Sequence, residues 1–142
     1  MRSARHRSRE FALQAVYSWL ISKGTLEAIQ SQFSEAKGFD KVDLEFFLML
    51  VAGTVADAEA LDQVLAPALD RRPVELSPVE HAILLLASFE LREFPTVPYR
   101  VVINEAIELA KSYGGTDGHK FINGVLDKLS RTLRPDESRA RA

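Results

Sequence analysis

The sequence predicts an all-α protein of six to seven helices, and three observations support this fold class. Apolar residues recur at intervals of three and four through almost the whole chain, which is the period of an amphipathic helix. No segment alternates apolar and polar residues with the two-residue period of a half-exposed strand. Prolines, glycines and capping residues separate the periodic segments, as expected at helix ends. A chain of 142 residues is long enough for one domain with a buried core.

The helices are expected to pack as two subdomains, because neither group is large enough to fold alone. A connector with an interrupted apolar pattern separates them, and Arg71-Arg72-Pro73 within it can hold a helical turn. The expected limits within the single domain of residues 1–142 are 9–66 for the first subdomain, 67–76 for the connector, 77–134 for the second subdomain and 135–142 for a frayed tail.

Three helices are expected in the first subdomain. The first covers Arg9–Ser22 and ends before Gly24, which suits a left-handed cap. Thr25 can cap a short second helix through its hydroxyl group. Asp43 opens a long third helix, in which apolar residues recur until Pro67 stops it.

Three further helices are expected in the second subdomain. Ser77-Pro78-Val79-Glu80 combines an N-cap serine, a proline in the first turn and a glutamate in capping-box position, so a helix begins here. It runs to about Phe94. The next helix covers Tyr99–Tyr113 and is closed by two glycines. Asp117 is expected to cap the last helix, which Pro135 ends.

The sequence offers no arrangement expected of an enzyme or a metal site. Cysteine is absent, so disulfides, thiolate metal ligands and a cysteine nucleophile are excluded. The histidines at 6, 81 and 119 show no paired-ligand spacing. The glycine-rich stretch 114–118 follows a helix and lacks the lysine of a phosphate-binding loop. We therefore expect no catalytic residue, no metal and no cofactor.

The sequence also predicts no membrane association. No apolar run approaches the roughly 18 residues needed to span a bilayer. The basic N-terminus is followed by an amphipathic pattern rather than by the apolar block of a signal peptide. A soluble, cytoplasmic protein is therefore expected.

Charge is distributed unevenly along the chain. Residues 1–23 hold five basic groups and one acidic group, residues 24–110 hold six and fifteen, and residues 111–142 hold seven and four. Both ends are therefore positive and the middle is acidic. If the ends meet in space, they form a basic face that attracts phosphates; the alternative is that both are solvated tails.

Nucleic-acid binding is the chemistry that these residue types favour. Arginine and lysine contact phosphates, and unpaired bases stack on exposed aromatic rings. The first helix opens with an arginine cluster, Tyr17 lies off its apolar stripe, and a helix N-terminus beside Asp117 favours a phosphate. The candidate RNA-binding residues are Arg5, Arg7, Arg9, Tyr17, Asp117, His119, Lys120 and Phe121, with Arg2 beside the arginine cluster.

Structural roles are the alternatives for several of these positions. Phe121 can pack in the core, and Tyr17 can pack beneath a helix or against a protein partner. Glu80 can act only in its capping box or can also pair with a cation of a partner. The apolar run at 83–86 extends more than halfway round its helix, so one flank that includes Leu84 can meet another protein. Gly124 inside the last helix predicts the close approach of another backbone.

Several stretches resemble the NusB family of bacterial transcription antitermination factors, and together they cover essentially the whole chain. The stretches INEAIELAK and KFINGVLDK are the most specific of them. The matching segments are Arg5–Tyr17, Asp43–Gly53, Pro78–Leu91, Val97–Tyr99, Ile103–Lys111 and His119–Asp127.

The resemblance implies an all-helical RNA-binding protein that pairs with NusE, a small-subunit ribosomal protein. It implies recognition of the single-stranded boxA element of nascent transcripts, notably of ribosomal RNA operons. It also implies assembly with NusA, NusG and RNA polymerase. The implied RNA contacts fall on Arg5, Arg7, Arg9 and the region of Lys120 and Phe121. The implied NusE contacts fall on Tyr17, Glu80 and Leu84.

Two alternatives accompany this interpretation. The first is a protein-interaction scaffold that does not itself contact RNA, with its arginine-rich start bound to an acidic partner. The second is the N-terminal domain of a ribosomal RNA cytosine methyltransferase, which this chain also resembles. We do not expect the second, because no catalytic domain follows in this sequence and no cysteine is present to attack a pyrimidine.

Overall fold

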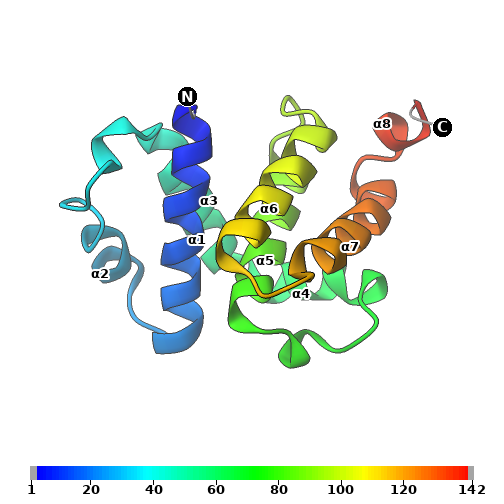
Figure 1. Cartoon of the computed structure of the whole chain (residues 1–142), viewed down its shortest axis with the longest axis horizontal. Helices are drawn as coiled ribbons and strands as arrows, with labels where there is room; N and C mark the ends of the chain where they lie inside the picture. The colour runs from blue at the N-terminus through cyan, green and yellow to red at the C-terminus, as the bar shows by residue number, and fades with distance from the viewer. Residues whose placement is uncertain (1–2, 141–142) are drawn as a thin grey trace.

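A computed structural model describes residues 3–140, except for the side chains of 139 and 140, and these residues form an all-helical domain (Figure 1). The all-α expectation is confirmed, although the described residues contain eight α-helices instead of six or seven. Three short 3-10 turns accompany them. The helices are α1 (Ala4–Ser22), α2 (Leu26–Ser31), α3 (Leu44–Ala56), α4 (Ala58–Leu65), α5 (Pro78–Glu93), α6 (Tyr99–Tyr113), α7 (Gly118–Leu133) and α8 (Pro135–Ala140), and the turns are η1 (Phe39–Lys41), η2 (Ala66–Ala68) and η3 (Pro73–Glu75).

Helix α1 begins five residues earlier than the sequence pattern indicates. The hydroxyl group of Ser3 accepts a hydrogen bond from the backbone N–H of His6 at 3.0 Å, which caps the helix before its basic residues. At the other end Lys23, not Gly24, adopts the left-handed conformation with φ 56°. The arginine cluster therefore lies inside a helix, and its members point in different directions.

The long helix expected after Asp43 is two helices, so that expectation is wrong. Asp43 caps α3 as predicted, accepting a bond from the Phe46 N–H at 3.1 Å. The helix breaks at Asp57, which has φ −107° and ψ 16°, and its carboxylate is held by Arg92 of α5 at 2.5 Å. The caps expected at Thr25 and Ser77 are confirmed, since each hydroxyl group accepts a bond from the N–H three residues later.

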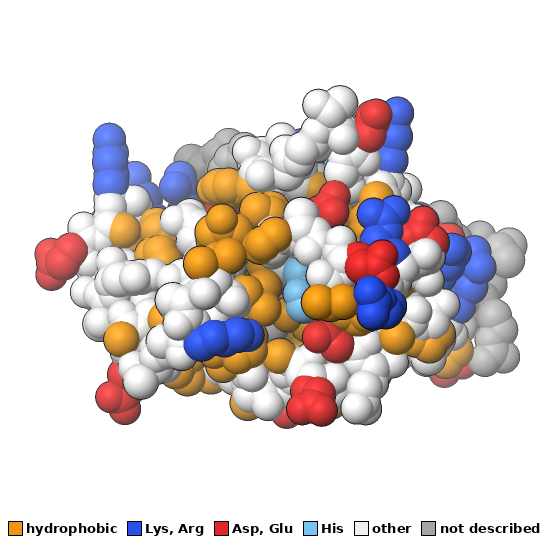
Figure 2. Space-filling view, turned by 90° about the horizontal axis from the view of Figure 1, so that it is seen from below, with side chains coloured by type: hydrophobic (Ala, Val, Ile, Leu, Met, Phe, Trp, Pro, Cys, Tyr) orange, Lys and Arg blue, Asp and Glu red, His pale blue; other side chains and the backbone are white. Residues whose placement is uncertain are grey.

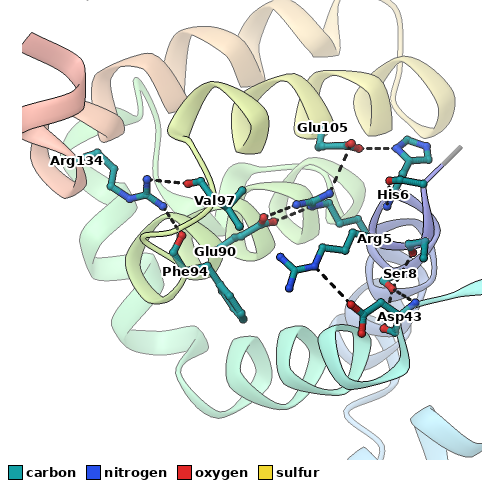
Figure 3. Close-up of polar contacts among 12 residues, drawn as sticks. Arg5, His6, Ser8, Asp43, Glu90, Phe94, Val97, Glu105 and Arg134 are labelled. Atoms are coloured by element: carbon teal, nitrogen blue, oxygen red, sulfur yellow. Dashed lines mark hydrogen bonds and ion pairs between the residues drawn. The ribbon is translucent and has the colours of Figure 1, made fainter. Parts of the chain in front are cut away.

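The expected frayed tail is an ordered helix over residues 135–140. The buried guanidinium of Arg134 donates to the backbone oxygens of Leu91, Phe94 and Val97 at 2.7–3.0 Å, which satisfies carbonyls at the end of α5 and just beyond it (Figure 3). Arg134 also pairs with Glu137 of α8 at 2.6 Å. This network fixes α8 against the domain.

Helix α5 lies at the centre of the core. Ten consecutive residues, Ala82–Leu91, are buried, because α1, α3, α4, α6 and α7 all pack against α5. The division of the chain into two subdomains stays a prediction. Figure 1 shows α1, α6 and α7 side by side. No helix within residues 3–140 is long and apolar enough to cross a membrane.

Candidate nucleic-acid and partner interfaces

The turn between α6 and α7 presents a small group of charged and aromatic side chains. Asp117 precedes α7 in a left-handed conformation with φ 64°, instead of the extended conformation usual for an N-cap residue. Its carboxylate caps no backbone N–H and lies 3.3 Å from the Lys120 ammonium group, so the expected capping role is wrong. Both side chains are exposed, and His119 between them is partly exposed. A weak, solvated ion pair of this kind leaves Lys120 available to a stronger anion.

Phe121 is half-buried beside this turn, and Arg71 covers its ring. The guanidinium carbon of Arg71 lies 4.4 Å from the ring centroid, within the range of a cation–π contact. Asp70 holds Arg71 through two bonds of 2.7 and 3.3 Å. The hydrogen bond to Asp70 raises the pKa of Arg71, and the nearby charge of Glu80 adds to the rise.

Arg71 is a candidate site residue that the sequence analysis missed. It lies 50 positions before Phe121 in a connector, and only the folded chain brings the two together. The basic pair Arg71-Arg72 was visible in the sequence, but nothing there indicated which aromatic ring it meets. A guanidinium stacked on an aromatic ring presents a flat cationic face on which an unpaired base can stack.

The arginines of α1 differ in their surroundings. Arg5 is exposed, lies 3.5 Å from the Asp43 carboxylate and covers the Phe46 ring at 4.3 Å. Arg7 is partly exposed and lies beside Gly38, and within the described part of the chain its side chain has no ion pair. Arg2 lies outside the described residues. Of Arg5 and Arg7, Arg7 is the one whose charge is more available to a phosphate, because Arg5 pairs with Asp43.

Arg9 points into the protein, so the expectation of a surface RNA contact by Arg9 is wrong. It is 6% exposed, and it donates to both carboxylate oxygens of Glu90 at 2.9 and 2.6 Å (Figure 3). Glu105 of α6 lies 3.6 Å from Arg9 and also contacts a ring nitrogen of His6 at 2.5 Å. A buried charge needs such partners, so Arg9 joins α1 to α5 and α6 instead of contacting a ligand.

Tyr17 is 40% exposed at the edge of an apolar hollow between α1 and the start of α5. The hollow has a volume of about 330 Å³. Its lining joins Tyr17 to the first turn of α5 and to the end of α6, because Val79 and Tyr113 both contribute. The complete lining is Leu13, Gln14, Tyr17, Phe33, Val79 and Tyr113.

A second, larger hollow of about 610 Å³ lies on the end of the molecule that holds the end of α1 and the start of α5. Figure 2 shows apolar side chains gathered over this end around a histidine. The exposed apolar members include Ile21 and Val74, which are 59% and 78% exposed. The lining is Leu20, Ile21, Lys23, Asp62, Arg72, Pro73, Val74, Leu76, Pro78 and His81.

Of the residues predicted on α5, the structure leaves Glu80 accessible and Leu84 inaccessible. Glu80 is partly exposed in the first turn of α5, and its carboxylate reaches Gly118 at the start of α7. Leu84 is fully buried, so the prediction that it contacts a partner is wrong. The physical reason is that neighbouring helices surround α5 and leave no free flank at residues 83–86.

The folded chain therefore assembles most of the predicted residues around the start of α7. Glu80 approaches Gly118 directly, and Lys120 and Phe121 follow within the first turn of α7. Tyr17 joins this region through its hollow. Arg5 and Arg7 lie apart at the start of α1, with α6 between them and α7 (Figure 1). Among the side chains described, no group of three histidine or acidic residues could hold a metal ion.

Comparison with known proteins gives concordant results. A family model described as the NusB family matches residues 6–131. The transcription antitermination protein NusB of Paraburkholderia phytofirmans is 54% identical over 140 residues, which cover 99% of this chain and 97% of that protein.

Two solved structures share the fold. T. maritima NusB superposes with a TM-score of 0.85 at 27% identity, over 99% of both chains. A crystal structure of the antitermination factors NusB and NusE in complex with dsRNA matches with a TM-score of 0.80 at 24% identity, over 89% of this chain and 96% of that chain.

Proposed function

The chain belongs to the NusB family of transcription antitermination proteins, and from this premise we propose that it binds single-stranded RNA as a heterodimer with NusE. The observation that carries the proposal is the meeting of two kinds of surface at the start of α7. Cationic and aromatic groups at Lys120, Phe121 and Arg71 suit an RNA strand. Glu80, which reaches the same turn, suits a cation of a protein partner.

On the RNA side, each group has a defined task. Lys120 exchanges its weak contact with Asp117 for a phosphate, and the amides at the start of α7 add to the attraction. Phe121 and the guanidinium of Arg71 form one stack on which an unpaired base can lie. Arg7, and Arg5 beside it, bind the phosphates of a more distant part of the strand.

On the protein side, Tyr17 and Glu80 border the NusE surface. The two apolar hollows, of about 330 and 610 Å³, provide the apolar area that a stable heterodimer buries, and Tyr17 and Glu80 provide polar contacts at its edge. A solved complex of this fold contains NusB, NusE and RNA together, which supports the pairing. Because the two surfaces meet, each ligand is expected to strengthen binding of the other.

We propose the finer identity of the ligands by analogy with the family. The RNA is the boxA element of nascent transcripts, notably those of ribosomal RNA operons. The heterodimer joins NusA, NusG and RNA polymerase to suppress termination. Such a role places the protein in the cytoplasm and requires no catalytic residue.

Fluorescence anisotropy of a labelled boxA RNA tests this proposal. The affinity is measured for this protein alone and with purified NusE, against an RNA of scrambled sequence. Tighter binding of boxA than of the scrambled RNA, strengthened by NusE, is expected. Equal, weak binding of both RNAs in both conditions would contradict the RNA role.

The second candidate is a protein scaffold that does not contact RNA. The burial of Arg9 favours it, because that burial removes one cation from the predicted basic surface. The salt dependence separates the two candidates. Phosphate contacts give a slope of about −0.7 per contact in a plot of log affinity against log salt for single strands. A scaffold forms its protein complex with no dependence on RNA.

A further inference from the structure

A polar hollow of about 330 Å³ lies between α6 and α7, apart from the residues discussed above. Its volume falls within the roughly 300–1,000 Å³ typical of ligand sites. Unlike the hollow beside Tyr17, it is lined mainly by polar side chains. The lining residues are Arg100, Ile103, Asn104, Asn123 and Asp127.

Three of these side chains have unused hydrogen-bonding capacity. Arg100, Asn104 and Asn123 are exposed, and within residues 3–138 none of the three side chains has a hydrogen bond or ion pair. Asp127 differs, because its carboxylate accepts a bond from Arg131 at 3.0 Å, which offsets its negative charge. One guanidinium and two amides are therefore directed at an open hollow without competing partners.

Gly124 directly follows Asn123, which lines this hollow, and no described residue packs against Gly124 at the position of a Cβ atom. A glycine inside a helix is destabilising relative to alanine, and the sequence predicted that another backbone of the chain approaches it closely. That expectation is wrong, because a Cβ atom added at Gly124 would meet nothing within 4 Å. Gly124 follows Lys120 by one helical turn on the same side of α7. It leaves a low point on the exposed surface of α7, next to Asn123.

The hollow lies between the two groups of cations proposed to bind RNA. On one side, His6 of α1 contacts Glu105, the neighbour of Asn104 on α6. On the other side, Asn123 and Gly124 follow Lys120 by about one turn of α7. Figure 1 shows α1, α6 and α7 in this order across one face. A strand that runs over this face from the start of α1 to the start of α7 crosses α6, which lines the hollow.

We propose that the hollow binds the middle nucleotides of a single-stranded RNA that runs from the start of α1, across α6, to the start of α7. Arg100 contacts a phosphate, and the amides of Asn104 and Asn123 pair with base edges, since an amide both donates and accepts as a base edge does. The RNA then crosses α7 at Gly124, where no side chain obstructs it. This inference rests on the proposed function and assigns to it a site that recognises RNA bases, called the reading site below.

Substitution of Gly124 by glutamine tests whether the RNA strand passes close to α7 at this residue. The two quantities measured, Tm and RNA affinity, are expected to change in opposite directions. Glutamine is a good helix former, so Gly124→Gln is expected to raise Tm by about 2–4 °C. Its side chain obstructs the strand, so the affinity of the NusE heterodimer for boxA RNA is expected to fall about tenfold. Thr132→Gln, an exposed position later on α7, is the matched control and leaves the RNA affinity unchanged.

Two further variants test the assigned contacts. The double variant Asn104→Ala with Asn123→Ala is expected to weaken boxA binding about tenfold or more, without changing the salt slope, because amides release no counterions. Arg100→Gln is expected to reduce the slope by about 0.7, the value of one phosphate contact. Selectivity for boxA over the scrambled RNA falls for the asparagine variant only.

The outcomes separate this inference from the proposed function. If Lys120→Gln weakens RNA binding but the variants of the hollow bind like the wild type, the reading site is overturned and the proposed function stands. If the wild type binds no RNA, both fail. If the variants of the hollow weaken NusE binding in the absence of RNA, the hollow belongs to the protein partner and the inference is overturned.

Discussion

Replacement of Arg9 by methionine is expected to destabilise the fold without removing an RNA contact. Arg9 and Glu90 are 6% and 3% exposed, and two hydrogen bonds of 2.9 and 2.6 Å join them. Arg9→Met leaves the Glu90 carboxylate buried without this partner, which costs about 3–5 kcal/mol. For a domain of this size, the loss corresponds to a fall in Tm of roughly 10–17 °C. Urea unfolding followed by circular dichroism measures the loss of free energy of unfolding, and thermal unfolding measures the fall in Tm.

A compensating variant separates stability from RNA binding. Arg9→Met combined with Glu90→Leu replaces the ion pair by apolar groups of similar volume, which is often neutral or stabilising. We expect the double variant to recover most of the lost stability and to bind boxA RNA with the affinity of the wild type. If the double variant is stable but binds RNA much more weakly, Arg9 reaches the RNA and the structural role assigned to it is refuted.

Three other substitutions address the surface, the core and the C-terminal helix. Arg7→Gln is expected to leave Tm unchanged and to reduce the salt slope of RNA binding by about 0.7, and anisotropy at several salt concentrations measures it. Gly53→Ala would place a Cβ atom 2.0 Å from the Phe89 ring, so a loss of about 1–3 kcal/mol is expected by urea unfolding; wild-type stability would contradict the close packing of α3 on α5. A hydrogen bond from the Tyr99 N–H lowers the pKa of Glu137 in the folded protein. The ionised Glu137 therefore stabilises the fold fully above the unfolded-chain pKa of about 4.3, and this stabilisation is lost as the pH falls through the lower pKa of the folded state. Glu137→Gln should therefore lose less stability than the wild type between pH 5 and pH 3. Equal losses would show that the Glu137 carboxylate does not cause the loss of stability in acid.

Local signals in the sequence were sufficient to locate most helix starts. Thr25, Asp43 and Ser77 each cap a helix as predicted, because a cap depends on residues only three positions apart. The start of α1 was missed although Ser3 is a capping residue of the same type. The arginines that follow it carry no apolar periodicity, so the pattern alone placed the helix start at Arg9.

Side-chain direction was harder to predict, because it depends on which helices pack against each face. Arginines two positions apart on a helix point in different directions, so Arg7 stays at the surface and Arg9 enters the core. Leu84 has no free flank because α5 is surrounded by neighbouring helices. Arg71 reaches Phe121 from a distant connector, and no local pattern encodes such a contact.

The RNA and partner surfaces are proposed to meet at the start of α7, and the coupling between the two ligands tests whether they do. The Kd of NusE is measured by calorimetry with and without saturating boxA RNA. If the surfaces meet, RNA tightens NusE binding by the same factor by which NusE tightens RNA binding, because coupling is reciprocal. A Kd for NusE that is independent of RNA would contradict the claim.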